Sequence, residues 1–167
     1  MHNELTQKDI ELMRQELNYR RTVLRPKLIE DVQTARAFGD LSENFEYKAA
    51  KRDKNRNDSR CRYLENMIRT AVVISDQSGD GTVGLYDRVT FYAEEDDETV
   101  TCQIVTTMRQ NALENLISKE SPVGKAVLGR RVGDRVTVQV NDSYSYDVVI
   151  QAIEPGEDTG EGPLIGF

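Results

Sequence analysis

Phe38-Gly39-Asp40-Leu41-Ser42 is the only turn-like stretch between residues 6 and 69. The residues on both sides of it are mostly Glu, Lys, Arg, Gln, Leu and Ala, which favour helices. Two helices of similar length that are joined by a few residues have to run antiparallel. The stretch therefore predicts a helical hairpin with its tip at residues 38–44. At ~1.5 Å per residue, arms of about 25–30 residues would reach roughly 40–45 Å.

Both arms carry apolar residues at helical spacing. In the first arm the steps are three, four and seven residues, at Ile10, Met13, Leu17, Leu24 and Leu28. In the second arm steps of three and four alternate, at Tyr47, Ala50, Lys54, Asn57, Cys61, Leu64 and Ile68. This heptad spacing is typical of a coiled-coil seam, although two central positions are polar. Pro26 lacks an N–H group, so we expect it to bend the first arm.

The pattern changes after Arg69, where strand-like alternation replaces helical spacing. The clearest strands are expected near residues 136–140 and 144–150, joined by a turn at residues 141–143. One short helix is expected to begin with Ser121 as its N-cap and Pro122 as its first residue. The sequence thus predicts an α+β protein. It has a long antiparallel coiled-coil hairpin over residues 1–75, a small antiparallel β-sheet domain with one short helix over 76–154, and a flexible acidic, Gly-rich tail over 155–167.

The bulk composition narrows the class of protein. The 167 residues carry a formal net charge of -7, yet seven Lys or Arg face only two Asp between residues 48 and 62. An acidic chain with one basic stripe is no general nucleic-acid binder, but it can present that stripe to phosphates at one place. Two distant cysteines and one histidine do not form a zinc-site pattern. No signal peptide or membrane-spanning segment is visible, so we expect a cytoplasmic monomer with reduced thiols and no membrane partner.

Two acids, Asp40 and Glu43, lie three residues apart at the predicted start of the second helix. This is the spacing of a capping box, in which Asp40 would be the N-cap and Glu43 would bond back to its amide. Spacing alone favours that interpretation. Alternatively, paired carboxylates at an exposed tip could bind a divalent cation. Magnesium takes few protein carboxylates and keeps several waters, so two acids would need a partner to complete the site.

Residues 39–51 closely resemble the tip motif of the bacterial transcript-cleavage factors GreA and GreB, G-D-L-x-E-N-x-E-Y-x-A-A-[RK]. Residues 115–122, 126–129 and 133–136 resemble successive blocks of that family's C-terminal domain, and the resemblance runs over about residues 5–153. It implies an elongation factor that docks on RNA polymerase through an FKBP-like domain. The coiled coil would enter the secondary channel and stimulate the polymerase's own cleavage of backtracked RNA, so the factor would have no complete active site of its own.

The resemblance also implies roles for particular residues. Asp40 and Glu43 would be ligands of a Mg²⁺ ion shared with the polymerase and would orient the attacking water. No cofactor is expected on the chain alone. Arg36 and Lys51, with Arg52 as a further candidate, fall where the family has basic residues near the 3′ end of the RNA. Ser121 and Pro122 would lie in the domain that docks on the polymerase.

Other interpretations stay open at this point. Residues 106–110 depart from the family pattern near the expected docking surface. This motivates a second hypothesis, in which a Gre-like paralogue occupies the channel and modulates or inhibits the polymerase without promoting cleavage. A third hypothesis is a binding module unrelated to polymerase, with the tip acids acting only as a cap. Phe38 and Phe45 flank the tip, and we expect them to staple the turn rather than to stack on a base.

Overall fold

The computed structural model of the chain describes residues 3–39, 43–75 and 79–166. It divides into two compact units: Ile10–Ala71, and Val72–Gly166 together with the first nine residues. This division lies close to the one expected near residue 75, except that the first nine residues belong with the sheet. No helix in these described ranges is long and apolar enough to cross a membrane.

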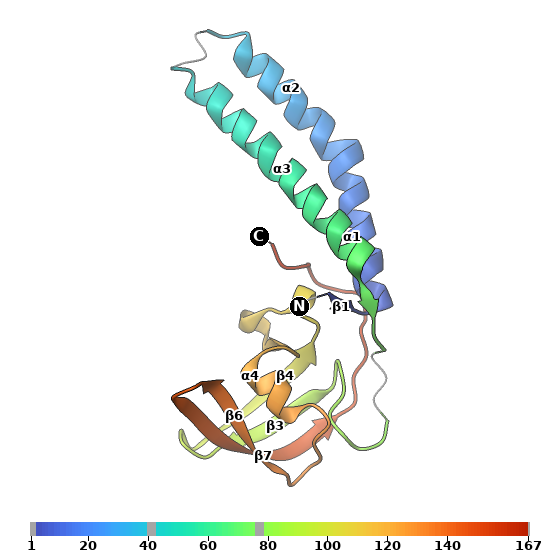
Figure 1. Cartoon of the computed structure of the whole chain (residues 1–167), viewed down its shortest axis with the longest axis vertical. Helices are drawn as coiled ribbons and strands as arrows, with labels where there is room; N and C mark the ends of the chain where they lie inside the picture. Colours follow the sequence, from blue (N-terminus) through green and yellow to red (C-terminus); the bar gives the residue numbers. More distant parts are fainter. Residues whose placement is uncertain (1–2, 40–42, 76–78, 167) are drawn as a thin grey trace. The chain divides into compact units, whose positions relative to one another are not determined.

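The first unit is the predicted helical hairpin (Figure 1). Its first arm consists of α1 (Gln7–Tyr19), a π-helical turn (Arg20–Leu24) and α2 (Arg25–Arg36), and its second arm is the single 26-residue helix α3 (Phe45–Thr70). Helices α2 and α3 pack against each other. The hairpin topology is therefore confirmed.

The first arm bends between α1 and α2 (Figure 1), and Pro26 lies in the first turn of α2. A proline at this position cannot donate to the carbonyl four residues back, and its ring crowds that carbonyl. The preceding turn widens into a π-helix, in which the N–H of Arg25 donates to the carbonyl of Arg20, five residues back. A wide turn of this kind accommodates the proline without ending the arm.

The seam between the arms is partly apolar and partly polar. Met13, Leu17, Cys61 and Leu64 are buried, as their spacing predicts. Asn57 is buried too, and it exchanges hydrogen bonds with Arg20 across the hairpin, at 3.0 Å to the guanidinium and 3.3 Å to the carbonyl. One of the two polar heptad positions, Asn57, thus has a matched partner across the hairpin, which satisfies its buried amide.

Arg60 adds a second polar link, which heptad spacing does not predict. It is only 4% exposed and holds Glu16 in a two-pronged ion pair, with N–O distances of 2.8 and 3.1 Å. Burial opposes ionisation of Glu16, but hydrogen bonds from Arg60 and Arg20 outweigh it and lower the pKa of this carboxyl. The two arms are therefore joined by charge as well as by apolar packing.

The second unit is built on a five-stranded sheet with the order β5-β4-β3-β7-β6. Its strands are β3 (Arg88–Ala93), β4 (Glu98–Val105), β5 (Leu116–Ser118), β6 (Arg135–Asn141) and β7 (Tyr144–Glu154). All neighbours are antiparallel except β4 and β5, which are parallel. The sheet is therefore mixed. Residues 106–115, which include 3₁₀-helical turns at Thr107–Arg109 and Ala112–Glu114, carry the chain back along β4 before β5 begins. Strands β1 (Glu4–Leu5) and β2 (Val72–Val73) form a separate parallel pair.

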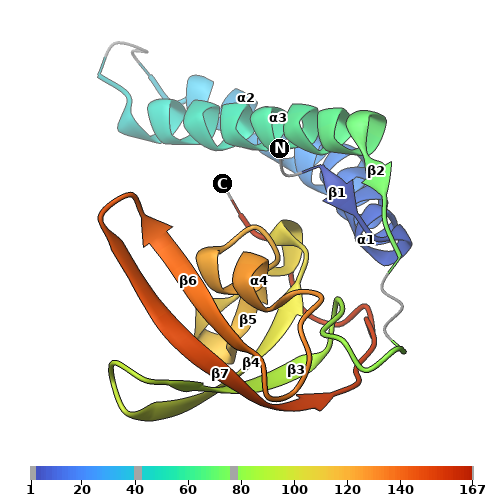
Figure 2. The ribbon, with the colours of Figure 1, turned by 60° about the horizontal axis from the view of Figure 1, so that its bottom comes forward.

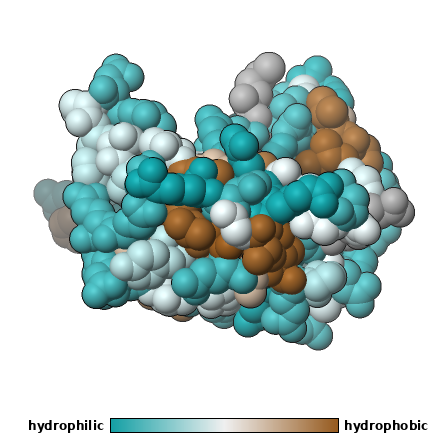
Figure 3. Space-filling model, turned by 90° about the horizontal axis from the view of Figure 1, so that it is seen from below, coloured by the Kyte–Doolittle hydropathy of each residue, from teal (hydrophilic) through white to brown (hydrophobic). Residues whose placement is uncertain are grey.

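The short helix α4 (Pro122–Val127) lies on the concave face of the curled sheet, as Figure 2 shows. The core of this unit contains Ile104, Val127, Val138 and Val148, each at most 1% exposed. Hydrophilic side chains cover most of the face seen in Figure 3, and hydrophobic ones show there in separate patches. The fold class is thus the predicted α+β arrangement of a helical hairpin and a small sheet domain.

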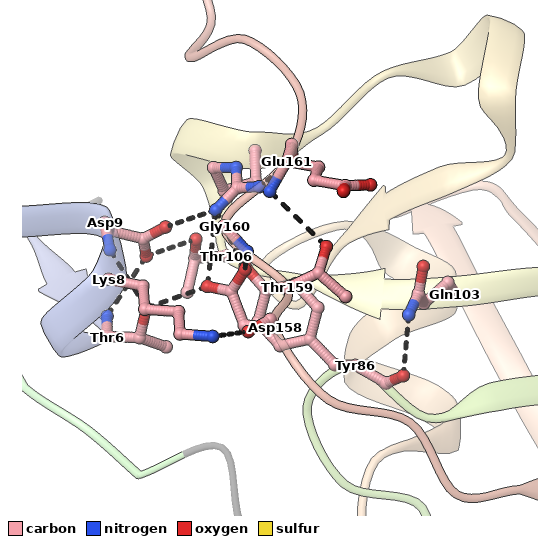
Figure 4. A network of polar contacts seen from close by, with 11 residues as sticks. Thr6, Lys8, Asp9, Tyr86, Gln103, Thr106, Asp158, Thr159, Gly160 and Glu161 are labelled. Atoms are coloured by element: carbon pink, nitrogen blue, oxygen red, sulfur yellow. Dashed lines mark hydrogen bonds and ion pairs between the residues drawn. The ribbon is translucent and has the colours of Figure 1, made fainter. Parts of the chain in front are cut away.

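A buried polar cluster joins the first turn of the chain to the C-terminal segment (Figure 4). Arg109, at 5% exposure, lies 3.1 Å from Asp158 and 3.5 Å from Asp9, both of which are at most 1% exposed. Thr106 donates to Asp9 at 2.6 Å, and Thr6 donates to Asp158 at 3.3 Å. The two carboxylates and the guanidinium form a compact ionic core within this unit.

This cluster changes the interpretation of residues 106–110. Their departure from the family pattern near the expected docking surface motivated the hypothesis of a paralogue that does not promote cleavage. Instead Thr106, Met108 and Arg109 are buried, and Arg109 pairs with Asp158 of the tail. The unusual residues therefore serve internal packing. Flexibility of the tail over residues 155–167 stays a prediction, but Asp158 within this tail is buried.

Candidate functional site at the hairpin tip

Helix α3 begins at Phe45, and its N-cap is Asn44. The Asn44 side-chain oxygen accepts from the backbone N–H of Tyr47 at 2.9 Å, and its amide donates to the carbonyl of Ala35 at 2.7 Å. One side chain thus satisfies a free N–H of α3 and ties the turn to the end of α2. Asn44 is thus a structural residue of the turn, and spacing alone does not identify it.

The position of Asn44 corrects the capping-box interpretation. In a capping box the Glu occupies the third position of the helix. Glu43 instead precedes the N-cap of α3, so it cannot fill that position, and its side chain is exposed. Asp40 lies outside the described residues. The Glu43 carboxylate is consequently available at the end of the hairpin.

The two phenylalanines at the tip do not staple the turn. Phe38 is 75% exposed and Phe45 is 81% exposed, whereas stapled rings would cover each other or the helices. Both rings line one hollow, together with Gly39, Glu43, Asn44 and Glu46. Gly39, which follows Phe38, has a φ of 153°, a conformation that favours glycine.

The predicted RNA-contacting residues fall in two places. Arg36, at the end of α2, approaches Tyr47, with 3.5 Å to the hydroxyl and 5.6 Å to the ring centroid. Lys51 and Arg52 are exposed on α3. They line a groove whose other lining residues are Lys48, Asn55, Arg56 and Ser59. The structure therefore gathers positive charge along one side of the hairpin behind the tip, and any contact with RNA stays a prediction.

Ser121 and Pro122 begin α4, as predicted. The Ser121 hydroxyl oxygen accepts from the backbone N–H of Gly124 at 3.0 Å, and Pro122 occupies the first helical position. These contacts explain both residues as a helix start. A role in docking stays a prediction.

The cap makes a prediction about stability. Replacing Asn44 with Ala removes the hydrogen bond from the Tyr47 N–H and the one to the carbonyl of Ala35, which keeps only a 3.2 Å bond from the Phe38 N–H. We expect the hairpin to lose about 1–2 kcal/mol of stability, measured by thermal melting of helical circular dichroism. Asn44→Asp keeps the accepting oxygen and should recover part of the loss. Asn55→Ala, an exposed substitution inside α3, is the control, and equal melting of the two alanine variants would contradict the cap.

The fold and the tip together define a class of protein. It has a helical hairpin with an exposed acid at its end and positive charge behind that acid, and a small α+β domain in the same chain. The comparisons with known proteins identify the family. Residues 3–73 match the family model described as "Transcription elongation factor, N-terminal", and residues 77–155 match "Transcription elongation factor, GreA/GreB, C-term".

Individual relatives agree with these matches. The chain is 46% identical to "Transcription elongation factor GreA" of Geobacillus kaustophilus over 136 residues, which cover 81% of this chain and 86% of that protein. It is 37% identical to the GreA of Staphylococcus epidermidis over 150 residues, or 90% and 95% of the two chains. A crystal structure of GreA factor homolog 1 of Thermus thermophilus aligns at 28% identity over 91% of this chain and 98% of that one, with a TM-score of 0.41. The chain belongs to the GreA/GreB family of transcription elongation factors.

Proposed function

We propose that this chain binds RNA polymerase, inserts its hairpin into the secondary channel and stimulates the polymerase's own cleavage of backtracked RNA. The observation that carries the proposal is the exposure of Glu43 and its position at the end of the hairpin. Its carboxylate is exposed and lies before the N-cap of α3, at the far end of a 26-residue helix. Such a helix spans about 39 Å. An acid held at the end of so long a hairpin is suited to act inside another molecule.

The donor chemistry of the tip fits magnesium. Carboxylate oxygens are the ligands that Mg²⁺ takes from proteins, and one or two of them suffice when other groups complete the shell. In residues 3–39, 43–75 and 79–166 no group of three His, Cys, Asp or Glu is placed to hold a metal ion. Asp40 and Glu43 would be half of a site, and the polymerase would supply the rest. When bound, the ion would stabilise the attacking and leaving oxygens of an in-line displacement.

The residues of this chain would then have separate tasks. Asp40 and Glu43 would hold and orient the attacking water by accepting its hydrogen bonds. Lys51 and Arg52 would attract the phosphates of the extruded RNA along the groove on α3. Arg36, already placed against Tyr47, would add positive charge beside the turn. The chain would contribute no complete active site of its own.

The alternative of a channel-occupying factor without cleavage loses its motivation. It rested on unusual residues near the expected docking surface, and Thr106, Met108 and Arg109 of that stretch are buried. They are accounted for by packing against the N-terminal turn and the tail. The exposed acid at the tip supports cleavage stimulation instead.

The test uses elongation complexes of the cognate RNA polymerase, backtracked by one nucleotide and supplied with Mg²⁺. The full chain is expected to accelerate release of the 3′ fragment in proportion to its concentration until the complexes are saturated. Raising the salt concentration should raise the factor concentration needed for half-maximal cleavage, because binding to RNA phosphates releases counterions. No acceleration at saturating factor, or slower synthesis without cleavage, would reject the proposal.

A further inference from the structure

The exposed rings of Phe38 and Phe45 have no task in the chemistry proposed for the tip. They are among the most exposed large hydrophobic side chains described, at 75% and 81%. They also share one hollow with Glu43. Single exposed apolar residues are common on protein surfaces, but two aromatic rings that line the same hollow form a small binding surface.

The surroundings of the rings decide which ligand fits. The Lys48 ammonium lies 5.8 Å from the centre of the Phe45 ring, and Glu43 and Glu46 line the same hollow. An apolar protein segment seated there would desolvate these charges without pairing them. A nucleobase has a flat π-face for the rings and a polar edge whose amino groups can donate to a carboxylate. Aromatic rings beside positive charges are the usual platform for unpaired nucleic-acid bases.

We propose that Phe38 and Phe45 form a stacking platform for the unpaired base at the 3′ end of the extruded RNA. The proposal rests on the proposed function, since it names the part of the RNA that the tip holds. The stacked base would fix the terminal nucleotide while Glu43 acts at the neighbouring phosphodiester. Purines have larger π-faces than pyrimidines, so a 3′ purine would be held more firmly and cleaved faster.

The experiment measures release of the 3′ fragment from complexes backtracked by one nucleotide, at factor concentrations below saturation. The RNA ends in A, G, C or U, or in an abasic nucleotide. Phe45→Ala and Phe38→Ala are expected to slow release about tenfold when the base is present, and to change nothing when it is absent. Phe45→Trp should remain close to the unsubstituted chain. Tyr19→Ala is the matched control, because Tyr19 is another exposed aromatic residue of the hairpin, 54% exposed and far along the first arm from the tip.

A second readout does not depend on cleavage. The chain contains no tryptophan, so Phe45→Trp introduces its single tryptophan at the hollow. Its emission should be quenched by complexes with an intact 3′ base and not by complexes with the abasic end. This quenching would persist even if the factor did not stimulate cleavage, which separates failure of the platform from failure of the proposed function.

Three results would overturn the platform. Equal slowing of both alanine variants on abasic and intact ends would show that the rings dock on the polymerase itself. Unchanged release by the alanine variants on intact ends would show that the rings are idle. Equal quenching of the Phe45→Trp variant by abasic and intact ends would show that no base reaches the hollow.

Discussion

Replacing Asp40 with Asn and Glu43 with Gln together is expected to abolish stimulated cleavage while leaving binding to the polymerase intact. The amides keep the size of the side chains but lose the charges that would hold a metal ion and orient water. A metal ion stabilises transition-state charge by several kcal/mol, and ~1.4 kcal/mol corresponds to a factor of ten in rate. We therefore expect at least about a hundredfold loss in the rate of 3′-fragment release at saturating factor.

The control for this variant has the same change in charge at exposed positions elsewhere on the hairpin. Glu30→Gln with Asp53→Asn also removes one Glu and one Asp charge, from exposed side chains of α2 and α3. It should cleave at the unsubstituted rate. The tip variant should still compete with the unsubstituted chain for the polymerase. Equal cleavage by the tip variant and the control would leave the acids without a role in the reaction.

The hairpin could be predicted from the sequence because its signals are local. Helix-forming residues, one break at residues 38–42 and a repeat of three and four residues specify two antiparallel helices. The same repeat does not predict the Glu16–Arg60 ion pair, because it joins the two arms. Pro26 predicted a bend of the first arm. It did not predict a π-helical turn, because the way in which a helix adapts to a proline depends on the arm packed against it.

At the tip, the spacing of the two acids predicted Asp40 as the N-cap of the second helix, but the N-cap of α3 is Asn44. Asp40 and Asn44 are both good N-cap residues, and the sequence does not state at which of them the helix begins. The structure selects Asn44, whose amide can also reach Ala35 on the other arm. That second contact belongs to the tertiary structure and has no local signature. The staple expected of Phe38 and Phe45 was wrong for the same reason, since ring contacts depend on the path of the turn.

The tail shows the limit of composition as a guide. Residues 155–167 are rich in Gly and acidic residues, which predicts a segment without a fixed partner. Asp158 is nevertheless 1% exposed, because Arg109 lies 49 residues before it in the chain and needs a second carboxylate beside Asp9. A buried arginine cannot be identified from its sequence neighbours, so its partners cannot be either.

This buried cluster carries the second large expected effect. Replacing Arg109 with Met keeps most of the apolar stem but removes the guanidinium between Asp9 and Asp158. Those carboxylates are 0% and 1% exposed, so they would be left buried without their cation. Breaking a buried pair by removing one partner costs about 3–5 kcal/mol. We expect the free energy of unfolding of the sheet domain to fall by about that amount, measured by urea denaturation.

The structure offers a closely matched control for the Arg109 experiment. Arg135 also bridges two carboxylates, Glu94 at 2.7 Å and Asp147 at 2.9 Å, but its side chain is 60% exposed. Water can solvate both acids once the guanidinium is gone, so Arg135→Met should cause a far smaller loss than Arg109→Met. Equal losses would mean that burial of Asp9 and Asp158 does not determine how much stability the Arg109→Met variant loses. A large loss confined to Arg109→Met would instead show that the buried carboxylates of Asp9 and Asp158 need this guanidinium, because water cannot solvate them.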